Sequence, residues 1–321
     1  MTRSPGPRAR RGVLAAAVAA ALAAVSALAW AIMPVGAAGP ARPAGPPRGP
    51  RAVASAVGVP AAPPGWSTVF ADGFNGPAGS APSTSWRYVP GPAVSVGNGE
   101  VETLTGSTSN GYLDGHGDLD ITAREHGRRW TSARIQTVSP DAGAPPGGEL
   151  AVVASIEQPG PADGLGYWPA FWMLGPGQWP EHGEIDIMED VNALSEHSGT
   201  LHCGIQDGGP CRETSGLISG LQPCPGCQAG YHTYAVVIDR ADAADESVTW
   251  YLDGRRFYRV NEDQVGAGPW REAVDHGFWI ILDLGVGGAY PDVVCGCTTP
   301  AGGTTPGAMM RVAYVAAYRT G

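Results

Sequence analysis

Three acidic side chains follow one another at short spacing in residues 184–189, which read Glu-Ile-Asp-Ile-Met-Glu. Alternation along a strand places Glu184 and Asp186 on one face and the isoleucines on the other. Strict alternation would turn Glu189 away, whereas one extra residue at Ile187-Met188, a β-bulge, returns Glu189 to the acidic face. The segment therefore predicts a bulged strand that presents three carboxyl groups together.

Three carboxyl groups on one face repel one another, so their grouping is costly unless they share protons or bind a cation. A trio with separated pKa values supplies an ionised nucleophile and a protonated acid, the pair that cleavage of a glycosidic bond requires. Two other interpretations stay open from the segment alone. It could be a solvated strand face, or a Ca²⁺ site, although it lacks the glycines of a calcium loop.

The rest of the sequence predicts the strands that must hold this segment. Several short stretches alternate or run apolar between turn signals, and they are 118–124, 149–157, 170–174, 234–238, 247–252, 278–284 and 309–318. Asp253-Gly254 is typical of a hairpin turn. No stretch keeps a helical period for more than about two turns. We therefore predict an all-β fold, a two-sheet antiparallel β-sandwich, rather than an α/β fold.

Composition and charge exclude several classes of function. The 321 residues are 43% hydrophobic and 16% charged, which supports a large core. The sequence contains no lysine, which excludes a Walker phosphate loop or a Schiff base. Seven of the 20 arginines precede Gly65, so the remainder carries 13 minus 30, or −17. This charge indicates that nucleic acid is not a partner and favours a neutral polymer over a sulfated one.

The N-terminal region predicts export. Arginines precede an apolar, alanine-rich run over 13–33, and small residues follow it, as in a signal peptide. An uncleaved membrane anchor is the alternative, because the run is long enough to span a bilayer. We therefore predict a signal peptide or anchor over 1–37, a Pro/Ala/Gly-rich linker over 38–64 and a catalytic domain over 65–321. The protein would then be secreted, or tethered to the membrane by the anchor.

The cysteines fit an exported protein, because six of them fall within the predicted domain. Proximity alone pairs Cys203 with Cys211, Cys224 with Cys227 and Cys295 with Cys297, which is one of 15 possible connectivities. A zinc site formed by the Cys224/Cys227 and Cys295/Cys297 pairs is the alternative.

The six residues from 184 to 189 resemble the signature of glycoside hydrolase family 16, in the bulged form of bacterial laminarinases, which are endo-β-1,3-glucanases. Further segments are similar to blocks of the family in the same order, and they are 98–100, 110–112, 131–135, 168–174, 199–202, 231–234, 250–254 and 281–288. Several blocks in order are more specific than one motif.

The resemblance implies a jelly roll of two curved sheets, with the glycan in a concave groove and a retaining double displacement. It assigns Glu184 as nucleophile, Glu189 as acid/base and Asp186 as the residue that orients Glu184. No cofactor and no catalytic metal are expected.

The resemblance also suggests residues that bind the glycan, each of which could instead be a packing or surface residue. Aromatic platforms suit the apolar faces of sugar rings, and the candidates are Trp168, Trp172, Trp179 and, further along, Trp270. His202 would lie beside the catalytic acids. Asn98, Glu100 and Arg134 occupy positions that resemble glycan-contacting ones.

The sequence departs from the family pattern at several positions. Ala151 and Val153 stand where we expect charged groove residues, and Asp283 replaces a usual asparagine. Ala313 replaces a frequent aspartate, so the calcium site on the convex face of many members is expected to be missing.

The combined prediction is a secreted, monomeric endo-glycosidase that hydrolyses neutral β-glucan at β-1,3-linkages. One alternative keeps the fold but acts on galactan or agar, or transfers sugar to sugar. A second alternative is a non-catalytic glucan-binding protein, which the presence of all three acids disfavours.

Overall fold

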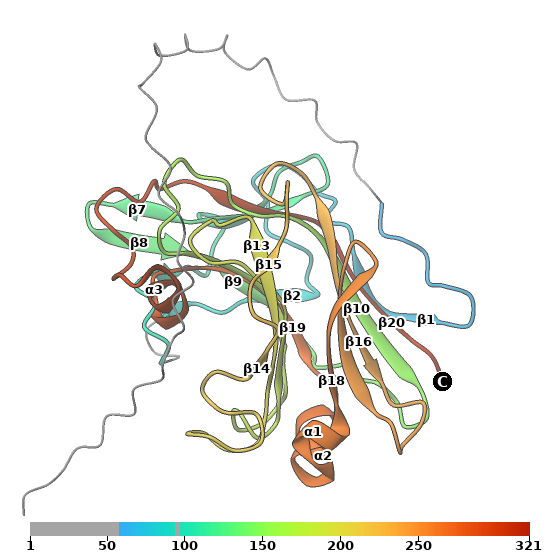
Figure 1. The fold of residues 1–321 in the computed structure, drawn as a ribbon. Helices are drawn as coiled ribbons and strands as arrows, with labels where there is room; N and C mark the ends of the chain where they lie inside the picture. Colours follow the sequence, from blue (N-terminus) through green and yellow to red (C-terminus); the bar gives the residue numbers. More distant parts are fainter. Residues whose placement is uncertain (1–57, 94–96) are drawn as a thin grey trace, which may run out of the picture. The chain divides into compact units, whose positions relative to one another are not determined.

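Alternating side chains build two large antiparallel sheets in this protein (Figure 1). The computed structural model describes residues 58–93 and 97–321. Within them, the predicted two-sheet β-sandwich is confirmed, and three short helices lie outside the sheets.

Sheet A has the order β18-β17-β16-β10-β20-β6-β5, with β1 also paired to β20. Its strands are β1 (Ser67–Asp72), β5 (Gly111–Leu113), β6 (Leu119–Thr122), β10 (Glu149–Glu157), β16 (His232–Asp239), β17 (Ser247–Leu252), β18 (Arg255–Asn261) and β20 (Met309–Arg319). The predicted Asp253-Gly254 turn joins β17 to β18.

Sheet B has the order β14-β13-β12-β11-β19-β9-β2, with β15 paired to β13. Its strands are β2 (Trp86–Tyr88), β9 (Arg134–Thr137), β11 (Tyr167–Leu174), β12 (Glu184–Glu189), β13 (Glu196–His202), β14 (Leu217–Ile218), β15 (Gln222–Pro223) and β19 (Trp279–Val286). A smaller third sheet contains β3 (Gly91–Pro92), β4 (Thr103–Leu104), β7 (Arg124–His126) and β8 (Arg129–Ser132). The predicted acidic segment is β12, near the middle of sheet B.

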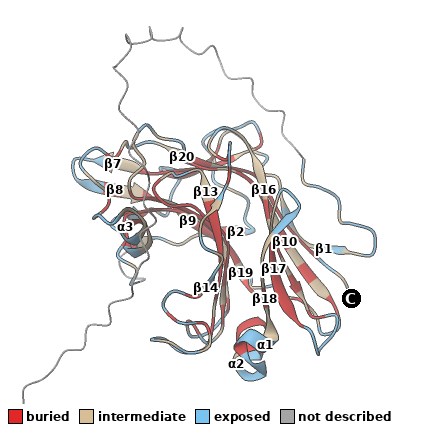
Figure 2. Ribbon diagram, viewed as in Figure 1, coloured by how far each residue is buried: buried red, intermediate tan, exposed pale blue. Residues whose placement is uncertain are grey.

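The core lies where the inner faces of the two sheets meet, and Figure 2 shows buried residues along both. On β10, Leu150, Val152 and Ala154 are fully buried. On β11, the odd-numbered residues are buried and leave the even-numbered ones for the opposite face. Because each strand buries one face, a shift of one residue would expose its apolar side chains, so the register is strongly fixed.

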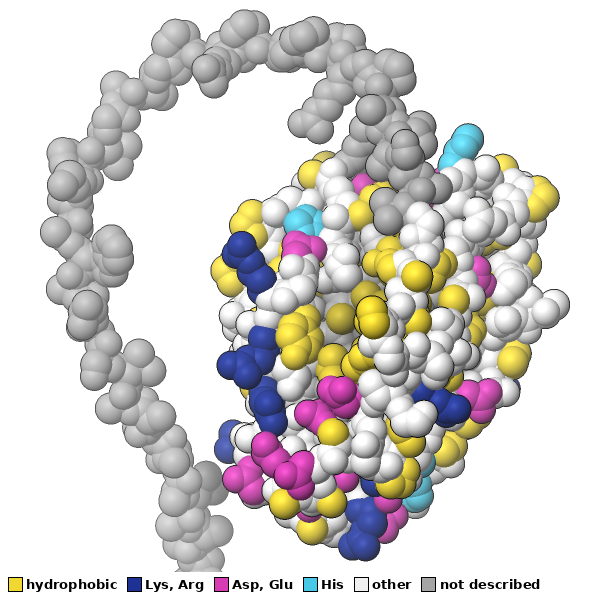
Figure 3. Space-filling view, turned by 90° about the vertical axis from the view of Figure 1, so that its right-hand side faces the viewer, with side chains coloured by type: hydrophobic (Ala, Val, Ile, Leu, Met, Phe, Trp, Pro, Cys, Tyr) yellow, Lys and Arg dark blue, Asp and Glu magenta, His cyan; other side chains and the backbone are white. Residues whose placement is uncertain are grey.

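The structure corrects one expectation about β10. Ala151 and Val153 do not replace groove residues, because β10 pairs with β16 and β20 in sheet A rather than lying in the sheet that holds the acids. They are half-buried on the outer face of sheet A. Figure 3 views the molecule from the side on which β1 lies in Figure 1, and it shows hydrophobic side chains over the middle of that face, with arginines and acids around them. The alanine and the valine at positions 151 and 153 therefore lie outside the sheet that holds the candidate site.

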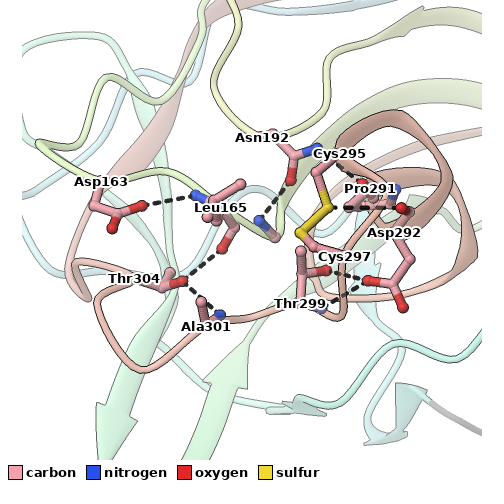
Figure 4. The surroundings of a disulfide bond; sticks show 11 residues. Asp163, Leu165, Asn192, Pro291, Asp292, Cys295, Cys297, Thr299, Ala301 and Thr304 are labelled. Atoms are coloured by element: carbon pink, nitrogen blue, oxygen red, sulfur yellow. Dashed lines mark hydrogen bonds between the residues drawn. A yellow bond between two sulfur atoms is a disulfide. The ribbon is translucent and has the colours of Figure 1, made fainter.

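Three short helices complete the described part of the chain: α1 (Glu262–Val265), α2 (Ala267–Val274) and α3 (Ala289–Cys295). Helix α3 follows β19 after two residues, Gly287 and Gly288. Asn192 donates a hydrogen bond from Nδ2 to the Pro291 carbonyl (2.9 Å) and accepts one from the Gly166 N–H (2.8 Å). These bonds tie α3 to the segment that follows β12 (Figure 4).

The three predicted disulfides are confirmed: Cys203–Cys211, Cys224–Cys227 and Cys295–Cys297. The zinc alternative is wrong, because its four cysteines are already paired with one another. Figure 4 shows Cys295–Cys297 at the end of α3, where Asp292 accepts bonds from the N–H and hydroxyl of Thr299 (2.7 Å each).

The predicted segment 1–37 and most of the predicted linker 38–64 lie outside the described residues. At the end of that linker, the Tyr318 hydroxyl donates a hydrogen bond to the Pro60 carbonyl. Over 58–93 and 97–321, none of the helices has the length and apolar character needed to cross a membrane.

Candidate active site

The predicted bulge is present in β12. Phe171 on β11 pairs with Met188, while the next residue, Trp172, pairs with Asp186. Ile187 is therefore the surplus residue. On the other side, Asp186 pairs with Thr200 and Glu189 with Ser198, which again leaves one extra residue in β12.

The bulge brings all three acids to the same face of sheet B. The side chains of Ile185 and Met188 are fully buried on the core side. Glu184, Asp186 and Glu189 lie opposite the even-numbered residues of β11, which also face away from the core. The predicted common face is therefore found in the structure.

The environment of Glu184 favours its neutral form. Burial and the nearby Asp186 carboxylate raise the pKa of Glu184 to about 8, although His202 and Arg134 act in the opposite direction. The cationic neighbours are therefore what oppose protonation of this carboxyl group.

Glu189 is held by an indole. Trp168 donates a hydrogen bond from Nε1 to Glu189 Oε1 at 2.8 Å. Burial, followed by the charge of Asp186, raises the pKa of Glu189 well above its ordinary value. This shift favours the protonated form, which a general acid needs. Tyr290 on α3 packs edge-on against Trp168 with ring centroids 5.8 Å apart, and its hydroxyl donates to Ser198 Oγ at 3.1 Å.

His202 lies between two carboxyl groups. Its Nε2 is 3.4 Å from Asp186 Oδ2, and its Nδ1 is 2.7 Å from Glu213 Oε2. Burial opposes a charged imidazolium, but the interactions with Asp186 and Glu213 outweigh burial and raise the pKa of His202 well above its ordinary value. The shift favours the positively charged form of His202 beside Asp186.

Arg134 and Trp172 form a stacked pair on the same face. The Arg134 guanidinium lies 4.4 Å from the centre of the Trp172 ring, and Trp172 Nε1 donates to Asp283 Oδ1 at 3.3 Å. Burial raises the pKa of Asp283 to about 6, although Arg134 opposes the shift. The acidic replacement noted in the sequence therefore lies among the predicted glycan-binding residues.

Glu100 and Asn98 approach β19 from the loop before β4. Glu100 forms a bridge with Gly287, and the Asn98 carbonyl accepts a hydrogen bond from the Ala289 N–H (2.7 Å). Burial and Asp283 raise the pKa of Glu100 to about 7, against the effects of Asn98 and Arg134. Both predicted residues thus lie near the β19 end of the candidate site.

The structure places Trp179 and Trp270, both predicted to bind glycan, in different parts of the molecule. Trp179 is partly exposed, and its ring centre is 5.6 Å from that of His202, so it lies beside the acids. Trp270 does not join the site. It is on α2, only 2% exposed, and donates a hydrogen bond to the buried carboxyl group of Glu246 at 2.8 Å. The prediction that Trp270 binds substrate is therefore wrong, because this indole packs in the core with its polar edge satisfied.

The donor atoms of Glu184, Asp186 and His202 all lie within 4.8 Å of one another, a spacing that could hold a cation. However, both ring nitrogens of His202 already face carboxyl groups. An imidazolium in this position neutralises part of the acidic cluster without a metal. The arrangement suits acid/base and nucleophilic chemistry by two carboxyl groups in different environments.

The chain is similar in sequence and fold to known proteins. A family model described as "XgeA-like, catalytic GH16 domain" matches residues 147–215. The β-glucanase of Rhodothermus marinus is 30% identical over 248 residues, which cover 71% of this chain and 78% of that protein. The chain belongs to glycoside hydrolase family 16.

Solved structures of family 16 enzymes share the fold. The endo-1,3-β-glucanase of Streptomyces sioyaensis is 42% identical with a TM-score of 0.77, and the match covers 81% of this chain and 99% of that one.

Glucan endo-1,3-β-glucosidase A1 of Niallia circulans is 30% identical over 292 residues, or 82% of this chain. The chain spans only 40% of the length of that relative. The predicted family and jelly-roll fold are confirmed.

Two residues of this family 16 site were not predicted from the sequence. Tyr290 gave no signal, because nothing in the sequence indicates that α3 reaches Trp168. Glu213 did leave a signal, since the predicted Cys203–Cys211 pair brings residues just after Cys211 close to His202.

Proposed function

We propose that this protein is an endo-acting glycoside hydrolase that cleaves the β-1,3-linkages of a neutral β-glucan. The single observation that carries the proposal is the common face of Glu184, Asp186 and Glu189 on the bulged strand β12. Relatives whose names describe endo-1,3-β-glucanases support the choice of linkage.

The proposed mechanism is a double displacement. Glu184 attacks the anomeric carbon while Glu189 donates its proton to the leaving oxygen, which gives a glycosyl-enzyme ester. Glu189, now ionised, takes a proton from water, and that water attacks the anomeric carbon and releases Glu184. Asp186 orients Glu184, and the positive charge of His202 favours ionised Glu184 before attack.

The proposed glycan path follows the same face of sheet B. Trp168, Trp172 and Trp179 would offer apolar surfaces to the sugar rings. Arg134, Asn98 and Glu100 would then supply hydrogen bonds to hydroxyl groups. The acidic groups along this face, Asp283 among them, disfavour a sulfated or uronic-acid polymer by like-charge repulsion.

We propose that the protein acts outside the cytoplasm as a monomer, with 1–37 as the export segment, 38–64 as a linker and 65–321 as the catalytic domain. The three disulfides support an oxidising compartment.

Two experiments test the function. Glu184→Gln should reduce laminarin hydrolysis to background while leaving the melting temperature and laminarin binding close to wild type, because the substitution preserves shape and removes the nucleophile. Equal activity in this variant would end the catalytic assignment. Products should also be analysed on laminarin, lichenan, agarose and galactan. Cleavage of agarose or galactan alone would replace glucan as the substrate class.

A further inference from the structure

Glu213 contacts both His202 and the backbone of the next residue. Its Oε2 is 2.7 Å from His202 Nδ1, and its Oε1 accepts a hydrogen bond from the Cys203 N–H at 2.9 Å. The side chain of Glu213 is fully buried, and that of His202 is only 13% exposed. This carboxylate therefore has a defined position and faces the imidazole from the side opposite Asp186.

The loop that carries Glu213, residues 203–216, is held in place at both ends. The Cys203–Cys211 disulfide closes it directly after His202. Within it, the backbones of Gly208 and Glu213 exchange two hydrogen bonds (2.8 and 2.6 Å). Gly216 then packs so close to His202 that an added Cβ would lie 2.9 Å from the ring. These contacts hold the carboxylate against His202.

The charged groups around His202 come from two parts of the chain. Strand β12 contributes Glu184, Asp186 and Glu189, whose charges interact with the imidazole. The loop after β13 contributes Glu213. A carboxylate only accepts hydrogen bonds, so Glu213 requires Nδ1 of His202 to carry a hydrogen. With the ring fixed in this orientation, Nε2 points at Asp186.

We propose that Glu213 is a positioning residue of this site, which fixes the orientation and protonation of His202 so that the imidazolium stays beside Asp186 and Glu184. The inference rests on the proposed function, because the reaction is what needs an ionised Glu184. In the described part of the chain, the Glu213 side chain forms no hydrogen bond or ion pair with the acids of β12, and its own charge adds slightly to the rise in the pKa of Glu184. It acts through His202.

The decisive variant is Glu213→Gln, which keeps the size of the side chain and removes its charge. Its matched control is Asp253→Asn. Asp253 makes the same two contacts, with His232 Nδ1 (2.8 Å) and the Thr233 N–H (2.9 Å), away from the acids of β12. The pKa of His202 is measured by NMR titration, with its resonance assigned by its loss in His202→Gln. The kcat and KM on laminarin are measured in parallel.

We expect Glu213→Gln to lower the pKa of His202 by about 1 to 2 units, as for loss of one charge-assisted hydrogen bond. We expect kcat to fall about 10- to 100-fold with little change in KM, because a displaced group costs rate rather than binding. Asp253→Asn should change neither quantity. An unchanged His202 pKa in Glu213→Gln, or an equal loss of kcat in Asp253→Asn, overturns the proposal.

A second variant covers the case in which Glu213→Gln does not fold. Replacing Cys203 and Cys211 by serine keeps every charged group but releases the loop, and it should lower the pKa of His202 in the same direction. A folded serine variant with the wild-type pKa and kcat would contradict the role of the loop. The titration does not depend on turnover, so wild-type protein that cleaves no glucan would end the proposed function while leaving this test intact.

Discussion

Two histidines in this protein meet a carboxylate in the same way. His202 ends β13 and His232 begins β16, and each places Nδ1 within 2.8 Å of a carboxylate oxygen. In both cases the second oxygen of that carboxylate accepts the N–H of the residue after the histidine, at 2.9 Å. A disulfide is also close to each: Cys203–Cys211 begins one residue after His202, and the Cys224–Cys227 sulfurs lie within 4.8 Å of a His232 nitrogen.

The two pairs differ in what surrounds them. The side chain of Glu213 is fully buried, whereas that of Asp253 is 49% exposed. His202 turns its other nitrogen toward Asp186, and burial is outweighed by two carboxyl groups that raise its pKa. Asp253 shows a lowered pKa, because bonds from Thr233 and His232 outweigh the effect of burial. The same local motif thus lies beside the proposed catalytic groups in one place and at a surface turn in the other, and its neighbours make the difference.

Replacing each histidine by glutamine tests this contrast with the largest expected effect. We expect His202→Gln to lower kcat on laminarin about 100-fold, because it removes a positive charge from beside the reacting carboxyl groups. His232→Gln should stay within about twofold of wild type. Comparable losses in the two variants would show that the surroundings of His202 have no special role in the reaction.

The second largest expected difference between the His202 region and the His232 region is in how the free energy of unfolding depends on pH. Glu184 and Glu189 have raised pKa values, so the folded state holds their protons at a pH where the unfolded state has released them. The raised pKa of His202 acts with the same sign: its stabilisation is complete below pH 6.5 and is lost as pH rises through the folded value. The free energy of unfolding should therefore fall between pH 5 and 9, on the order of 2 kcal/mol.

Denaturant melts across this pH range provide the measurement. Glu184→Gln and His202→Gln should each flatten the decline, whereas Asp253→Asn should leave it unchanged. The lowered pKa of Asp253 stabilises the fold above its unfolded value of 3.8, and this contribution is lost only as pH falls further. A stability that rises from pH 5 to 9 would contradict the raised pKa values.

The smallest expected effect is the loss of stability when the exposed His232–Asp253 pair is broken. Asp253→Asn should lower the free energy of unfolding at pH 7 by only about 0.2 to 1 kcal/mol, because the pair is partly solvated. Urea unfolding of this variant and wild type at low and high salt measures the difference. A loss several times larger would show that the β17–β18 turn depends on this contact far more than its exposure suggests.

The sequence was sufficient where one strand determines the geometry. Alternation and the resemblance together predicted the bulge at Ile187-Met188, and cysteine proximity predicted all three disulfides. Contacts between distant segments were harder to predict. Trp270 was expected to bind glycan, but a short helix and a buried glutamate partner place it in the core. Tyr290 reaches Trp168 from α3, which a hydrogen bond joins to Asn192, and no local pattern indicates this contact.

The surplus residue in β12 determines which face of the sheet each later side chain of the strand occupies. If the bulge were straightened while Ile187 was kept, every proposed catalytic side chain would remain, but the residues after Ile187 would change faces. Glu189 would then face the sandwich interior, and an apolar methionine would take its place among the acids. The proposed site therefore depends on the irregular pairing of this strand as much as on its three acidic residues.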